Sequence, residues 1–144
     1  MTNAYIAAPF FNEEQVTSVE KVKECLIQHG YTFFSPKDHN PINPTASYLE
    51  QKEGFDTNVM EISNASVIVA ITDGKDMGTL FECGYAFASN IPIIYVAFSL
   101  GDNPFNLMLA HSSYAVCKTI EDLVNALKNL KDKREGDKYD GIIE

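Results

Sequence analysis

Glu82 is the side chain whose type and position point most clearly to chemistry. It lies in the segment DMGTLFECGYA, among glycine, alanine, cysteine and aromatic residues, and Asp76 opens the same segment. A carboxylate held by backbone N–H groups in the first turn of a helix stays ionised in apolar surroundings and can attack an electrophilic carbon. Two carboxylates beside a sugar C1 are also the usual equipment for cleaving a glycosidic bond. The pair therefore indicates chemistry at a sugar carbon.

A plainer interpretation places Glu82 on the solvated face of its helix, where most glutamates lie. The helical spacing counts against this, because Glu82 stands in the middle of a stripe of mostly small residues. The stripe consists of Gly78, Thr79, Glu82, Tyr85, Ala86 and Ser89. Spacing alone leaves both interpretations open. Gly84 in the same segment is expected to relieve crowding where another element crosses the helix.

The sequence offers little for other kinds of chemistry. Neither GxGxxG nor GxxxxGK[ST] occurs, and TDGKDMGT has the spacing of neither phosphate-binding loop. The cysteines and histidines stand singly, at Cys25, Cys83, Cys117, His29, His39 and His111. Such isolated residues predict no disulfide framework and no metal site, and Cys83 is expected to fill space in the core. We therefore expect neither a metal nor a cofactor.

The bulk composition excludes several classes of partner. The 144 residues carry a net charge of −9 and offer no cationic stripe for a nucleic-acid backbone. With 45% hydrophobic and 22% charged residues, the chain has the balance of a soluble protein, without an apolar run long enough for a membrane span. The amino-terminal MTNAYIAAPFF lacks the basic segment of a signal peptide. We expect a cytoplasmic protein that binds neither nucleic acid nor membrane.

Strand and helix patterns alternate along the chain. Short apolar segments predict strands at 4–9, 31–36, 66–74, 91–98 and 114–118. Capped or amphipathic segments predict helices at 12–30, 48–65, 79–90, 103–113 and 119–135, with Asn12 and Thr119 as N-caps of the first and last. The alternation predicts an α/β fold. It is a single doubly wound domain over residues 1–144 with a central parallel five-stranded sheet, similar to flavodoxin or Rossmann folds.

Ligands of such folds bind at the carboxyl ends of the strands. Four segments are expected there: 9–12, 35–47, 73–79 and 99–107. They bring together aromatic, acidic and amide side chains with little positive charge. Residues 36–47 are polar and too numerous for a simple connection, which is typical of a binding loop or lid. The sequence therefore predicts an acidic, amide-bearing pocket at this edge of the sheet.

Three segments resemble the nucleoside 2-deoxyribosyltransferases: YIAAPFF at the start, DMGTLFECGYA in the middle and NPFNLML after the next strand. The resemblance extends from about residue 4 to about residue 125. Its most specific part is the pattern Asp-x-Gly-x-x-x-Glu-x-Gly-x-Ala directly after a buried strand. It implies a doubly wound α/β fold and the transfer of 2-deoxyribose between nucleobases by a double displacement.

The resemblance also implies roles for individual residues. Glu82 is the expected nucleophile, which attacks C1′ and forms a covalent deoxyribosyl-enzyme. Asp76 is expected to bond the sugar hydroxyls, and Tyr5 to set the ionisation and orientation of Glu82. Phe10 matches an aromatic position that stacks on the base. Gly78 is small enough to let the sugar approach the backbone.

One position departs from the family. Where the family usually has an Asp that contacts the base and helps protonate it, this chain has Asn58. An amide can bond a base edge but cannot act as an acid. Asp56 lies two residues earlier and is expected to face away from Asn58, unless the helix is distorted at Gly54. The base preference and the source of the proton therefore stay open.

Two further features concern assembly and closure of the site. Asn106 and Met108 match an Asn-x-Met segment that reaches into the neighbouring subunit's pocket in the family, which implies a homo-oligomer with shared active sites. Its substrates are expected to be a 2′-deoxynucleoside and a free nucleobase. The tail, about residues 132–144, is expected either to close a pocket or to be mobile.

Two other functions compete with the transferase. A relative that hydrolyses 2′-deoxynucleoside 5′-monophosphates would use the same Glu82 with water as acceptor. It must hold a phosphate, and residues 99–107 contain no Lys or Arg, so a free 5′-hydroxyl is favoured. A non-enzymatic nucleoside- or nucleotide-sensing module on the same scaffold would not need the Glu82–Asp76 pair, which counts against it.

Overall fold

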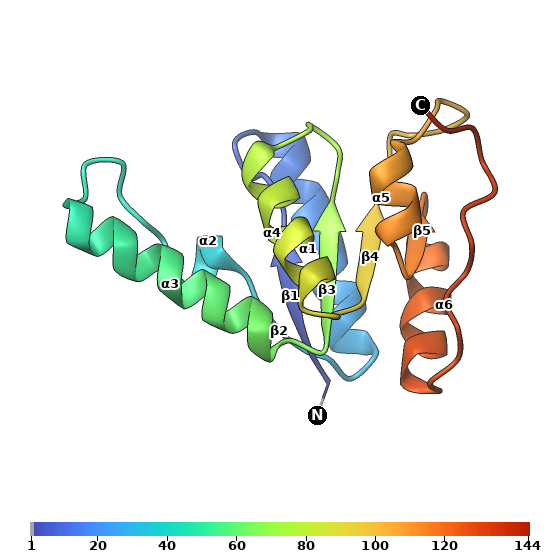
Figure 1. The fold of residues 1–144 in the computed structure, drawn as a ribbon, viewed down its shortest axis with the longest axis horizontal. Coiled ribbons are helices and arrows are strands. Elements are labelled where there is room, and N and C mark those ends of the chain that lie inside the picture. The colour runs from blue at the N-terminus through green and yellow to red at the C-terminus, as the bar shows by residue number, and fades with distance from the viewer. Residues whose placement is uncertain (1) are drawn as a thin grey trace.

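Five short strands lie side by side in one parallel sheet, in the order β2-β1-β3-β4-β5 (Figure 1). The computed structural model describes residues 2–144. The strands are β1 (Asn3–Ala7), β2 (Thr32–Phe34), β3 (Val67–Ile71), β4 (Ile93–Val96) and β5 (Ala115–Cys117). This is the strand order of flavodoxin-like, doubly wound proteins, so the predicted fold class is confirmed.

Helices cover both faces of the sheet. They are α1 (Glu13–Gln28), α2 (Pro36–His39), α3 (Tyr48–Asn64), α4 (Met77–Ala88), α5 (Leu107–Ser112) and α6 (Ile120–Lys131). One core lies between the sheet and helices α1 and α6, and a second lies between the sheet and helices α3, α4 and α5. The short α2 follows β2 and begins the segment that sequence alone suggested was a loop.

Alternate strand residues supply the two cores. Tyr5 and Ile68 point toward the α3–α4–α5 side, whereas Ile6 and Val69 point toward α1 and α6. All residues of β3 are buried, because this strand is covered on both faces. Its unbroken apolar sequence therefore predicted the centre of the sheet correctly.

Side-chain caps fix where the helices begin. Oδ1 of Asn12 accepts a bond of 2.9 Å from the backbone N–H of Gln15, and Oγ1 of Thr119 accepts one of 3.1 Å from that of Asp122. Both predicted N-caps are confirmed. Asp76 caps α4, so this helix begins two residues earlier than the predicted range of 79–90.

Two glycines have other roles than the sequence suggested. The helix α3 runs without interruption through Gly54, where a Cβ atom would overlap the side chain of Ile42. Gly54 thus allows the 36–47 segment to lie against the helix. At Gly84 a Cβ atom would meet nothing within 4 Å, so the expected crowding at this glycine is wrong.

The amino-terminal half of α3 extends away from the sheet, together with the segment that precedes it (Figure 1). Its apolar side chains there are exposed, among them Tyr48, Leu49 and Phe55. Within residues 2–144, no helix has both the length and the apolar character needed to cross a membrane.

Candidate active site

Tyr5 and Glu82 meet between the sheet and α4. Tyr5 is fully buried in β1, and α4 packs on β1 and β3 so that Glu82 lies over it. The Tyr5 hydroxyl donates a hydrogen bond to Oε2 of Glu82. Glu82 is half-buried and therefore faces inward, which decides between the two interpretations of its position.

The surroundings raise the pKa of Glu82 to about 7. Burial is the main cause, because it disfavours the charged carboxylate, and the negative charge of Asp76 adds to the effect, while the hydrogen bond from Tyr5 opposes it. Burial, followed by the charge of Glu82, also raises the pKa of Tyr5 far above its usual value. The proton of the pair therefore stays on Tyr5, and Glu82 changes its charge near neutral pH.

Asp76 is held in place by the helix that it caps. Its Oδ2 accepts hydrogen bonds from the backbone N–H of Thr79 at 2.9 Å and from the Thr79 hydroxyl at 3.0 Å. A Cβ atom on Gly78 would lie 3.3 Å from the same oxygen. The carboxylate is thus fixed at the start of α4. Its Oδ1 makes no protein hydrogen bond in the described residues, and Gly78 places no side chain beside it.

A row of rings leads away from Tyr5. The Phe34 ring stacks on Tyr5 with centroids 5.7 Å apart, and His39 stacks on Phe34 at 5.3 Å. Beyond His39, the amide of Asn40 bonds Oδ1 of Asn58 at 2.9 Å. Sequence reasoning missed Phe34 and Asn40, because their position depends on the pairing of β1 with β2.

Phe10 and Asp56 lie outside this row. The Phe10 ring is 39% exposed, 5.3 Å from that of Phe11, and Lys37 lies over it at 5.8 Å. Its accessible ring is available to a planar ligand. Asp56 is exposed and paired with Lys52, so it faces away from Asn58 as expected.

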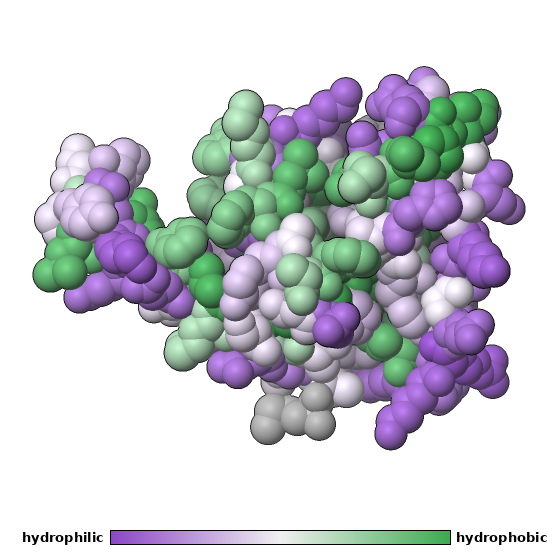
Figure 2. Space-filling model, in the orientation of Figure 1, coloured by the Kyte–Doolittle hydropathy of each residue, from purple (hydrophilic) through white to green (hydrophobic). Residues whose placement is uncertain are grey.

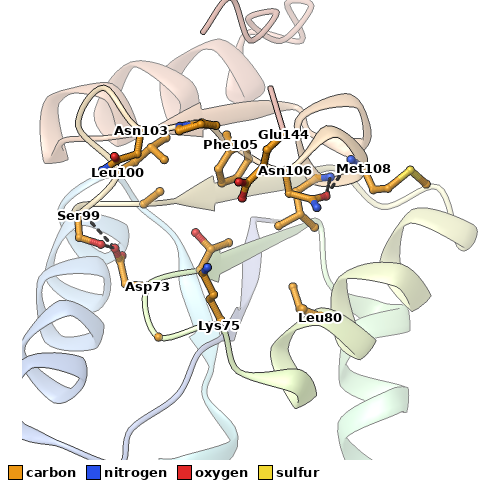
Figure 3. Close-up of a pocket in the computed structure, with 15 residues that line it drawn as sticks. Asp73, Lys75, Leu80, Ser99, Leu100, Asn103, Phe105, Asn106, Met108 and Glu144 are labelled. Carbon is orange, nitrogen blue, oxygen red and sulfur yellow. Dashed lines mark hydrogen bonds between the residues drawn. The ribbon is translucent and has the colours of Figure 1, made fainter. Parts of the chain in front are cut away.

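A cavity of about 720 Å³ lies on the other side of α4, next to α5 (Figure 3). Asn106, Met108 and Glu144 line it opposite Lys75 and Leu80. Neither Tyr5, Glu82 nor Asn58 lines this cavity. Within one chain, Asn106 and Met108 therefore line a different cavity from the one that Glu82 faces.

Asn106 has a structural bond of its own. Its Oδ1 caps α5 by accepting hydrogen bonds from the backbone N–H groups of Met108 at 2.9 Å and Leu109 at 3.2 Å. The side-chain amide nitrogen makes no protein hydrogen bond in residues 2–144, and the residue lines the cavity. Met108 is 74% exposed, which is unusual for a residue that only fills space.

The tail lies against the segment before α5 through an isolated parallel bridge between Phe105 and Ile143. Phe105 exchanges backbone hydrogen bonds with Ile142 and Glu144, at 2.8 and 2.9 Å, and Leu107 donates one to Glu144 at 3.0 Å. The ring of Tyr139 packs 5.6 Å from that of Phe105. Glu144 thereby lies at the wall of the cavity.

Gly136 is the residue on which this docking of the tail depends. A Cβ atom there would overlap the backbone carbonyl of Tyr114, which cannot move away without disturbing β5. We expect Gly136→Ala to release the tail and to raise the rate of limited proteolysis within residues 134–144 by about tenfold, equivalent to about 1.4 kcal/mol. Gly84→Ala, which adds a methyl group in open space, is the control and leaves the rate unchanged. An undisturbed tail in Gly136→Ala would contradict the docking.

An inward-facing glutamate, bonded by the hydroxyl of a buried tyrosine between a flavodoxin-like sheet and α4, suits an α/β enzyme that works through a carboxylate. The profile of the nucleoside 2-deoxyribosyltransferases matches residues 4–117. The chain belongs to the nucleoside 2-deoxyribosyltransferase family. A sequence search of curated proteins finds no match.

Solved structures agree with this family. The chain is similar to a 2-deoxyribosyltransferase from Bacillus psychrosaccharolyticus, with 28% identity, a TM-score of 0.76, and coverage of 86% of this chain and 91% of that one. A conserved protein from Enterococcus faecalis matches with 21% identity, a TM-score of 0.75 and coverage of 90% and 99%. A CMP N-glycosidase from Clostridium botulinum matches with 16% identity, a TM-score of 0.61 and the same coverage. The last two likenesses concern the fold alone.

Proposed function

We propose that this protein transfers 2-deoxyribose between nucleobases through a covalent deoxyribosyl-Glu82 intermediate. The observation that carries the proposal is the Glu82–Tyr5 pair: a half-buried carboxylate, oriented by a buried hydroxyl and poised to ionise near neutral pH. Such a group is a suitable nucleophile for an anomeric carbon, because burial keeps competing water away from it.

The reaction has two balanced halves. In the first, Oε1 or Oε2 of Glu82 attacks C1′ of a 2′-deoxynucleoside. A C1′–O bond forms as the C1′–N bond breaks, and the base leaves with the bonding electrons and takes up one proton. In the second half, a nitrogen of the acceptor base attacks C1′ and loses one proton, and the C1′–O electrons return to Glu82. No proton is consumed overall.

The other residues position the substrate. The free Oδ1 of Asp76 accepts a hydrogen bond from a sugar hydroxyl, and Gly78 leaves room for the sugar beside it. The exposed ring of Phe10 stacks on the base. Asn58 bonds the base edge and does not act as an acid.

Chromatography tests the proposal directly. The protein is incubated with 2′-deoxycytidine and free adenine, and the products are separated over time. New 2′-deoxyadenosine, formed only when both compounds and protein are present, is the expected result. Free cytosine and deoxyribose without 2′-deoxyadenosine would overturn transfer.

A 2′-deoxynucleoside 5′-monophosphate N-glycosidase is the second candidate, and Lys75 is the observation that favours it. Residues 99–107 carry no cation, but Lys75 from the β3–α4 loop lines the cavity beside Ser99 and Asn106, where an anionic group could be held. Release of free base and deoxyribose 5-phosphate from dCMP or dGMP, without exchange between bases, would favour this activity over transfer.

The transferase acts as a homo-oligomer whose sites are shared. Apolar side chains gather over α4 and beside it (Figure 2), and Phe81 and Phe87 on this helix are 55% and 58% exposed. A second copy that covers this surface would remove it from water. It would also let the Asn106 and Met108 of one chain reach the Glu82 of another, which they do not reach within one chain.

Mixing two inactive variants tests sharing. Glu82→Gln and Asn106→Ala are each expected to be inactive alone. If sites are shared, random mixing after unfolding and refolding together restores about a quarter of the wild-type rate, because one site in four pairs an intact Glu82 with an intact Asn106. Each variant refolded with itself is the control. No recovery in hybrids that form normally would show that both residues serve one chain's own site.

A further inference from the structure

Asn40 and Asn58 form an amide pair whose orientation the backbone determines. The Nδ2 group of Asn40 lies 2.9 Å from the carbonyl oxygen of Gly54 and 2.9 Å from a side-chain atom of Asn58. A carbonyl oxygen only accepts hydrogen bonds, so the Asn40 atom facing Gly54 must be the nitrogen. Because that nitrogen donates, the Asn58 atom facing it must be Oδ1.

The pair therefore presents a fixed pattern of donors and acceptors. Both hydrogens of Asn40 Nδ2 are used, which leaves Oδ1 of Asn40 as an acceptor. Oδ1 of Asn58 is used, which leaves its Nδ2 group as a donor. Both residues are half-buried, so their free atoms can be reached by a ligand. Gly54 permits this arrangement, because Ile42 occupies the space that a larger residue would need.

The pair lies at the far end of the row of rings that begins beside Glu82. The ring row that begins at Tyr5, beside Glu82, runs through Phe34 to His39, with centroid steps of 5.7 and 5.3 Å. Asn40 follows His39 directly, and Asn58 reaches it from α3. These three rings stack on one another, so their faces cover each other and the exposed Phe10 is the ring left for the base. The amide pair then meets the polar edge of the base.

We propose that the Asn40–Asn58 pair selects nucleobases with an amino group beside a ring nitrogen acceptor, namely adenine and cytosine, over their keto counterparts hypoxanthine and uracil. This rests on the proposed function. Asn58 Nδ2 donates to N7 of adenine or N3 of cytosine, and Asn40 Oδ1 accepts from the adjacent amino group. An asparagine reads adenine in DNA by the same complementarity.

Keto bases lose this arrangement in the pose that adenine and cytosine adopt. With N7 of hypoxanthine at Asn58, its O6 faces Asn40 Oδ1, and two acceptors oppose each other. If the base turns so that O6 meets Asn58 and N1–H meets Asn40, N7 has no donor while the C1′–N bond breaks. In uracil N3 carries a hydrogen and cannot accept from Asn58. The base regains two bonds, from O4 to Asn58 and from N3–H to Asn40, only by leaving the position that cytosine takes. The penalty therefore falls on base departure as well as on binding.

Two isosteric substrate pairs provide the test. We expect kcat/KM for 2′-deoxyadenosine to exceed that for 2′-deoxyinosine by about tenfold to a hundredfold, and 2′-deoxycytidine to exceed 2′-deoxyuridine similarly. Asn40→Ala removes the acceptor and frees Asn58 to turn, so both ratios should fall to about one while transfer persists. Asn64→Ala, an exposed asparagine at the end of the same helix, is the control and keeps the wild-type ratios. Ratios near one, or in favour of the keto bases, in the wild-type protein would overturn the inference.

A binding measurement separates this inference from the proposed function. Glu82→Gln cannot turn over, so calorimetry with free adenine and free hypoxanthine reports recognition of the base alone. Tighter binding of adenine, lost in Glu82→Gln/Asn40→Ala, supports the amide pair even if exchange is absent and the transferase proposal fails. Equal binding, or no binding of either base, would overturn the inference even if exchange occurs.

Discussion

Glu82→Gln is expected to reduce deoxyribosyl transfer by about 10⁴-fold or more, because the amide has no carboxylate oxygen to form the bond with C1′. The change is nearly isosteric, and the Gln side-chain oxygen still accepts the hydrogen bond from Tyr5. Folding should therefore be unaffected. Initial rates of 2′-deoxyadenosine formation measure the effect, and circular dichroism verifies the fold.

A second readout identifies the intermediate. Wild-type protein incubated with a 2′-deoxynucleoside and no acceptor base should carry a deoxyribosyl adduct on the peptide containing Glu82, visible by mass spectrometry. Glu82→Gln should carry none. Glu24→Gln on the exposed side of α1 is the matched control and should keep full activity and the adduct. Substantial transfer by Glu82→Gln would mean that another group attacks the sugar.

Most of the fold could be predicted from local sequence. The continuous apolar run of β3 and the capping residues Asn12 and Thr119 each specify their element without help from distant residues. The start of α4 was predicted at residue 79, two residues too late, because the carboxylate of Asp76 caps the helix and lets it begin at Met77. Gly84 was misinterpreted, since whether a neighbour crosses at a glycine depends on tertiary packing alone.

The residues of the candidate site also fall into two groups, those that local sequence reveals and those that only tertiary contacts place. Glu82 and Asp76 lie on one helix, so their helical spacing revealed them. Phe34 and Asn40 escaped notice, because they reach the site through the pairing of β1 with β2 and the approach of α2 to α3. Lys75 was overlooked as a cation near Asn106, because the β3–α4 loop meets α5 only in three dimensions. Contacts between distant segments, rather than residue types, decide these positions.

Tyr5→Phe is expected to move the pH dependence of transfer to higher pH. The nucleophile must be ionised, so kcat/KM of the wild-type protein should rise with pH and level off above the Glu82 pKa of about 7. The Tyr5 hydroxyl lowers that pKa by bonding the ionised carboxylate. Without the hydroxyl, burial and the charge of Asp76 act unopposed, and the carboxylate ionises only at higher pH.

The loss of activity in Tyr5→Phe depends on the pH of the assay. Each unit by which the pKa rises lowers the ionised fraction about tenfold at pH 6, so Tyr5→Phe should be most impaired in acid and recover partly at pH 9. Tyr85→Phe is the matched control on α4. Its hydroxyl bonds Ser63 at 2.8 Å and does not contact Glu82, so its profile should match that of the wild type. An equal loss at every pH in Tyr5→Phe would mean that Tyr5 orients Glu82 without setting its ionisation, whereas an unchanged profile would remove Tyr5 from the reaction.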